Sequence, residues 1–156
     1  MTTRSLTIAG GLISALLVSC AAMAAGQKAP EGTGQEITLR LCTANCHGAQ
    51  TFLSERRSKS QWLETIETMK VEGAKGTDEE FRIALGYLVA HLGIPVRINK
   101  ATARQIDDAM DLPAGHADAI VKYRDENGSF ADFAALLKVP GIDVKKLEEQ
   151  KGKILF

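Results

Sequence analysis

The chain has 156 residues, and its 19 Lys and Arg residues balance 19 Asp and Glu residues, so the formal charge is zero with neutral histidine. This length fits one ordinary domain or two small ones and excludes a large multidomain enzyme. Hydrophobic residues make up 45% and aromatic residues 5%, which predicts a globular protein with an aliphatic core. The balanced charge excludes a polyelectrolyte that binds nucleic acid by bulk attraction.

Residues 1–25 have the features of an export signal. Arg4 supplies a positive charge, Leu6–Val18 is apolar, and small residues follow. Two processing routes are open: ordinary signal-peptidase cleavage, or a lipobox ending at Cys20, whose acylation would anchor the protein to a membrane. We therefore expect a periplasmic or otherwise exported protein. Residues 26–35 hold three glycines and one proline and are expected to be a flexible tether.

The rest of the chain shows helical patterns and no convincing strand alternation. In residues 60–72, Trp62, Ile66 and Met69 recur at i, i+4 and i+7, which places them on one helical face. Two further helices are predicted to begin at the capping boxes of Thr77 and Thr102. Three more are predicted from apolar residues at helical spacing: one with Ala117, Ile120 and Val121, one with Phe133, Leu136 and Leu137, and a last one with Leu147. Pro95 and the extended segment 96–98 separate two halves, so we predict an all-α protein of two small domains.

The motif with the most specific chemistry is Cys42-Thr-Ala-Asn-Cys46-His47. Covalent haem attachment needs two thiols for the vinyl groups and a histidine directly after the second thiol, and the usual spacing is CxxCH. Here the spacing is CxxxCH, which still supplies every reactive group. Two alternatives stay open: a Cys42–Cys46 disulfide, and a zinc site completed by His91 or His116.

Residues 36–94 resemble the small single-haem cytochrome c domains of quinohaemoprotein dehydrogenases and related periplasmic proteins. The resemblance is carried by the haem motif, Trp62 with Met69 and the segments 73–80 and 86–88. It implies haem c as cofactor, Cys42 and Cys46 as thioether attachment points, His47 as proximal ligand and Met69 as distal ligand. The inserted residue between the cysteines departs from the family pattern.

The distal position has other interpretations. Met69 shares an apolar helical face with Trp62 and Ile66, so it can also be a packing methionine. His91 is the alternative distal ligand. His/Met ligation would give an electron-transfer haem with no open position for a substrate.

Residues 98–156 resemble the tandem helix-hairpin-helix module of the competence protein ComEA. The segments 98–102, 119–124, 127–130 and 137–142 carry this resemblance. It implies DNA binding without sequence preference, in which backbone N–H groups of each hairpin turn hold a phosphate.

The binding turns depart from the family pattern. The first turn, placed at Asp111-Leu-Pro113, lacks the glycine pattern, because its proline removes a donor and its aspartate adds a charge that repels phosphate. The second turn is Gly141-Ile142-Asp143. Residues 98–156 carry 9 basic and 10 acidic residues, which predicts weak DNA binding. The candidate DNA contacts are Gly141, Ile142, Lys145 and Lys146, and Asp143 can also be the N-cap of the last helix.

Two functions follow from these patterns. The first is a periplasmic c-type haem protein that carries single electrons to a redox partner protein, with the second module as a docking or weak DNA-binding unit. The alternative is a ComEA-like, non-specific DNA-binding protein of the competence type. No arrangement of catalytic residues stands out, so we do not expect an enzyme.

Overall fold

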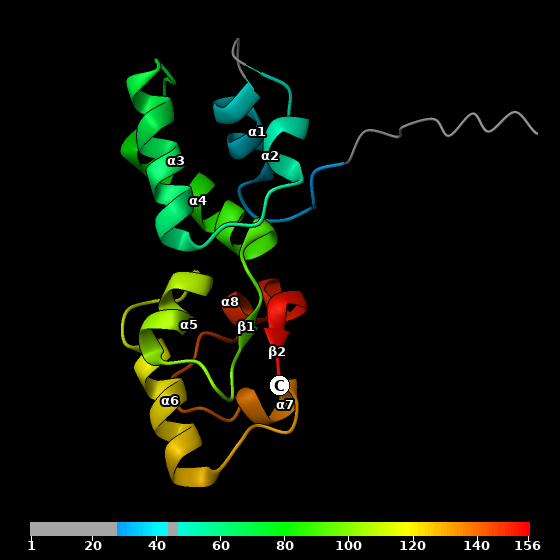
Figure 1. The fold of residues 1–156 in the computed structure, drawn as a ribbon, viewed down its shortest axis with the longest axis vertical. Coiled ribbons are helices and arrows are strands. Elements are labelled where there is room, and N and C mark those ends of the chain that lie inside the picture. The colour runs from blue at the N-terminus through cyan, green and yellow to red at the C-terminus, as the bar shows by residue number, and fades with distance from the viewer. Residues whose placement is uncertain (1–27, 44–46) are drawn as a thin grey trace, which may run out of the picture.

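The computed structural model describes residues 28–43 and 47–156, and these form two helical groups stacked along the long axis (Figure 1). The predicted export signal, Cys20 and Cys46 lie outside the described residues. The chain is mostly helical with one small sheet, which confirms the helical fold class and adds two short strands. No helix in the described ranges combines the length and the apolar character that a membrane span requires.

The N-terminal group contains α1 (Gln35–Thr43), α2 (Gln50–Leu53), α3 (Lys59–Val71) and α4 (Asp78–Leu92). The predicted capping box of Thr77 is confirmed, because its hydroxyl accepts from Glu80 N–H and the Glu80 carboxylate accepts from Thr77 N–H. A second box, of Ser58 with Gln61, starts α3. The main buried side chains of this group are Leu41, Phe52, Leu53, Trp62, Ile66, Phe81, Tyr87, Leu88, Val89 and Leu92.

Residues 28–34 belong to the stretch predicted to be a tether. In the structure Ala29 is 7% exposed, and the Tyr87 hydroxyl donates to the Pro30 carbonyl at 2.6 Å. This part of the stretch therefore packs against α4.

The C-terminal group begins with β1 (Val96–Arg97) and ends with β2 (Ile154–Leu155). Between them lie α5 (Ala103–Ala109), α6 (His116–Asn127), α7 (Phe133–Leu136), α8 (Val144–Glu149) and a short 3-10 helix at Lys151–Lys153. β1 and β2 pair in parallel, with Val96 opposite Ile154. The sequence predicted an extended segment at 96–98 but no partner for it.

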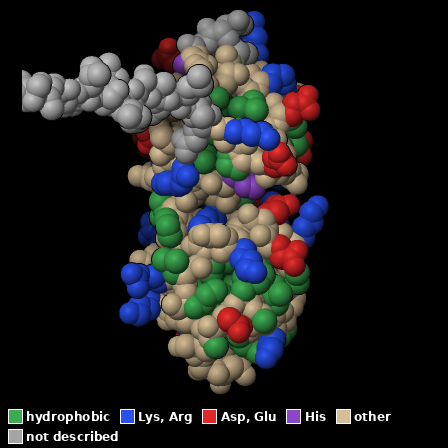
Figure 2. Space-filling model, turned by 90° about the vertical axis from the view of Figure 1, so that its right-hand side faces the viewer, with side chains coloured by type: hydrophobic (Ala, Val, Ile, Leu, Met, Phe, Trp, Pro, Cys, Tyr) green, Lys and Arg blue, Asp and Glu red, His purple; other side chains and the backbone are tan. Residues whose placement is uncertain are grey.

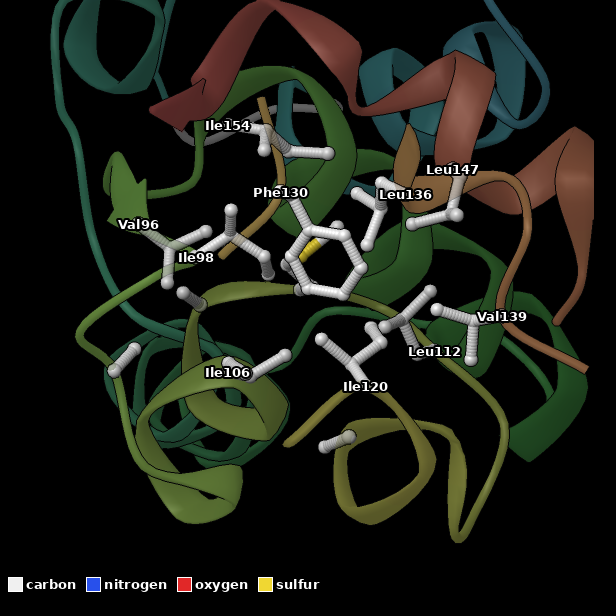
Figure 3. Close-up of a cluster of buried hydrophobic side chains, with 14 residues drawn as sticks. Val96, Ile98, Ile106, Leu112, Ile120, Phe130, Leu136, Val139, Leu147 and Ile154 are labelled. Atoms are coloured by element: carbon white, nitrogen blue, oxygen red, sulfur yellow. The ribbon is translucent and has the colours of Figure 1, made fainter. Parts of the chain in front are cut away.

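Apolar side chains from both strands and all four α-helices of the C-terminal group meet in one core (Figure 3). Ile106 of α5, Ile120 of α6 and Leu136 of α7 are fully buried. Asn99 joins two loops, since its Nδ2 donates to the Phe130 carbonyl and its Oδ1 accepts from Phe130 N–H, both at 2.8 Å. These bonds tie the loop before α5 to the loop between α6 and α7.

A buried lysine lies between the two groups. Lys153 is 8% exposed, and its Nζ donates to the carbonyls of Val89 in α4 and of Ala109 in α5. Both carbonyls are at helix C-termini, which favour a positive charge. A nearby bond runs from Ser60 N–H to the Asp108 carboxylate at 2.8 Å. The two groups are thus in polar contact through several backbone groups.

Candidate functional site

The first hairpin consists of α5, the loop 110–115 and α6. Gly115 precedes α6 with φ +81°, a left-handed conformation that glycine adopts readily. No side chain caps α6, and His116 N–H donates to the Pro113 carbonyl at 3.2 Å, so the N–H groups of Ala117 and Asp118 are left for solvent or a ligand. The residues 111–113, at which the sequence placed the turn, lie inside this loop, and Gly115 adds a left-handed residue at its end.

The second hairpin consists of α7, the loop 137–143 and α8. Gly141 has φ +74° and is exposed. The predicted N-cap is confirmed: the Asp143 carboxylate accepts from Lys146 N–H at 3.0 Å. One backbone donor of this turn is therefore already occupied.

The two hairpins are joined to each other at Asp111, the second residue of the first loop. Its carboxylate pairs with Lys146 Nζ of α8 at 2.5 Å. Its backbone N–H donates to the side chain of Gln150, which follows α8, at 2.8 Å. The negative charge that was predicted to repel phosphate is neutralised within the protein.

The lysines near the hairpins fall into two classes. Lys146 is engaged with Asp111, Lys153 is buried, and Lys151 Nζ lies 4.9 Å from the ring centroid of Phe133. Among the described residues, Lys138 and Lys145 are exposed and take part in no ion pair. These two exposed lysines of the second hairpin are candidates to meet a phosphate backbone.

One face of this half carries charged side chains of both signs. On the face shown in Figure 2, Lys and Arg side chains alternate with Asp and Glu, and hydrophobic side chains lie between them. Such a surface offers few phosphate contacts, so we expect weak, salt-sensitive binding.

The N-terminal group contains a separate apolar pocket of about 220 Å³. Cys42, His47 and Met69 all line it, together with aromatic and aliphatic side chains that include Trp62 and Phe81. Burial raises the pKa of the Cys42 thiol to about 11, so the thiol is neutral at pH 7. The structure thus brings together three of the four residues predicted to bind haem, and the fourth, Cys46, lies outside the described ranges.

The alternatives for this motif fare differently. His91 is not among the pocket-lining residues, and its ring lies 4.7 Å from that of Tyr87 on another side of α4. Within residues 28–43 and 47–156, no cluster of three or more His, Cys, Asp or Glu side chains could hold a metal ion. Haem c and its ligands stay predictions.

Comparison with known proteins identifies the C-terminal group. Residues 93–155 match the family model described as the helix-hairpin-helix motif. They form a helix-hairpin-helix domain. The chain is 39% identical over 62 residues to an uncharacterized protein of Haemophilus influenzae. The matched residues are 39% of this chain and 55% of that protein. It is 37% identical over 62 residues to ComE operon protein 1 of Bacillus subtilis. This match includes 40% of this chain and 30% of that protein. No solved structure matches the chain significantly.

These findings overturn the function that we predicted first. Single-electron transfer by a periplasmic c-type haem protein is wrong as the main function, because the matched family and the ComE relative favour the predicted alternative. The predicted electron-transfer role falls with it. The chain spans about half of one relative and less than a third of the other, so the activity of those whole proteins is not carried over as a finding.

Sequence reasoning missed two residues of this site. Gly115 could have been found, because a glycine directly before a predicted helix is a recognised turn signal. Gln150 could not, because a glutamine among Glu148, Glu149 and Lys151 has the pattern of an exposed helix end.

Proposed function

We propose that this is an exported protein whose helix-hairpin-helix domain binds duplex DNA without sequence preference. The match of residues 93–155 to the helix-hairpin-helix motif carries the proposal. The similarity to ComE operon protein 1 and the export features of residues 1–25 support it. Competence-type DNA reception is the process that this combination fits best.

The two loops suggest how DNA is held. The first turn of α6 offers the N–H groups of Ala117 and Asp118, because His116 N–H is taken by the Pro113 carbonyl, and Gly141 gives the second loop an open approach. Backbone N–H groups bind phosphate oxygens and do not read base edges, so the contact carries no sequence information. Lys138 and Lys145 add charge on the side of the second hairpin.

The test is a fluorescence anisotropy titration of the whole mature protein with a labelled DNA duplex at several salt concentrations. Reversing two charges with Lys138→Glu and Lys145→Glu should weaken binding and reduce the slope of log K against log salt by about 1.8, at 0.9 per phosphate contact. Lys75→Glu is the matched control, since Lys75 is exposed on the loop between α3 and α4, away from both hairpins. An equal loss of affinity in the control, or no saturable binding by the wild type, would sink the proposal.

Other features stay predictions beside this function. They are the cytochrome-c-like fold of residues 36–94, the haem c cofactor, a lipid anchor at Cys20 and the absence of enzymatic activity. The residues of the N-terminal pocket suit an apolar cofactor, because Cys42, His47 and Met69 line it with mostly apolar neighbours.

A further inference from the structure

Gln150 is a buried polar residue whose amide is fully used. It is 1% exposed. Its Oε1 accepts from Asp111 N–H at 2.8 Å, and its Nε2 donates to the carbonyls of Asp111 at 3.1 Å and of Lys146 at 2.9 Å. One side chain therefore binds both backbone groups of a residue in the other hairpin, which fixes the direction as well as the distance of the contact.

A second contact acts on the same loop residue. The Asp111 carboxylate pairs with Lys146 Nζ, and α4 of the N-terminal group covers this pair at Gly86. A Cβ atom at position 86 would lie 2.9 Å from Asp111 Oδ2 and 3.9 Å from Lys146 Nζ. The absence of a side chain at Gly86 lets the helix approach closely, so the pair is shielded from water on that side and holds its geometry better than an exposed pair.

We infer that Gln150 is a positioning residue for DNA binding. It keeps the first hairpin loop at a fixed distance from the second, and at this distance both loops reach the same duplex. This inference rests on the proposed function. Backbone N–H groups cannot reorient independently as a lysine can, so their affinity for phosphates depends on the spacing of the two loops. Loss of the amide contacts lets the first loop move while leaving every phosphate-binding group in the chain.

The variant Gln150→Glu tests this with a pH profile. A protonated carboxyl keeps one acceptor for Asp111 N–H and one donor for a carbonyl, whereas an ionised one turns only acceptors toward the carbonyls of Asp111 and Lys146. We expect DNA affinity within about twofold of wild type at about pH 5 and about tenfold weaker at about pH 8. The readout is the ratio of variant to wild type, because His116 at the start of α6 and the Asp111–Lys146 pair are present in both proteins.

The matched control is Gln105→Glu, which makes the same change of charge at an exposed position of α5. Its ratio to wild type should not change with pH. A Gln150→Glu ratio that is equal at both pH values, in protein shown by circular dichroism to be folded, overturns the positioning role. A wild type that does not bind DNA sinks the proposed function itself, which is a different outcome.

A second variant decides the matter if Gln150→Glu unfolds at the higher pH. Gln150→Met keeps the length of the side chain and removes the amide. We expect it to weaken DNA binding by about tenfold at both pH values and to lower the salt slope by about 0.9, as one loop loses its phosphate. Wild-type affinity and slope in folded Gln150→Met protein would overturn the inference.

Discussion

Lys153→Met is expected to remove a pH dependence of stability that the wild type shows above neutral pH. Burial lowers the pKa of Lys153 from 10.5 to about 7, and the nearby charge of Asp111 opposes this only in part. The unfolded chain keeps the lysine proton up to pH 10.5, whereas the folded chain loses it above about pH 7. The unfolded state therefore binds more protons in this window, and the free energy of unfolding rises with pH.

The size of the effect follows from the two pKa values. They differ by about 3.5, and each pKa unit corresponds to 1.36 kcal/mol, so the rise across the whole window is at most about 5 kcal/mol. Between about pH 7 and pH 8 it amounts to about 1 kcal/mol. Below pH 7 the lysine is charged in both states, and the cost of burying its charge is fully present.

Urea unfolding of wild type and Lys153→Met at a series of pH values measures this directly. The difference between the two free energies of unfolding should change in favour of the wild type as pH rises from 7 to 10. Burial also lowers the pKa of His91 below 6.5, so its titration affects stability only under more acidic conditions. A difference that stays constant from pH 7 to 10 would refute the role assigned to the buried ammonium.

Two further predictions concern the core and the haem motif. Asn99→Ala should lower the free energy of unfolding by roughly 2–3 kcal/mol, because both backbone groups of Phe130 lose a partner, and a loss under about 0.5 kcal/mol in a urea titration would contradict this. Haem c, predicted from the motif at 42–47, should stay attached through denaturing electrophoresis after export with haem-maturation enzymes. An unmodified mass of the exported chain would contradict that prediction.

The helix starts could be predicted because their signals are local. The capping boxes of Thr77 and Thr102 and the N-cap Asp143 each involve residues three apart, and all three form as expected. The end of α6 at Asn127 before Gly128 follows from the same kind of signal. The pairing of β1 with β2 could not be predicted, because strands of two residues have no alternation to recognise.

The candidate site was predicted in part for the same reason. Gly141 stands in a turn pattern that the sequence displays, and the structure gives it φ +74° in the loop before α8. The neutralisation of Asp111 depends on Lys146, which is distant in sequence and approaches it only through tertiary packing. The prediction of a repelling charge therefore failed because a local pattern cannot show which ion pairs the fold will make.

The pairing of β1 with β2 affects the order in which the parts of the domain fold. β1 opens the helix-hairpin-helix domain and β2 comes after its last helix, so the closing contact joins segments with the whole domain between them. Contacts of such long sequence separation form late in folding. If the chain crosses a membrane pore with its N-terminus first, α1 to α4 emerge before β2 does. The helices α5 to α7 then emerge before the strand that pairs with β1. Lys153, next to that strand, would then reach the ends of α4 and α5 in the same last step.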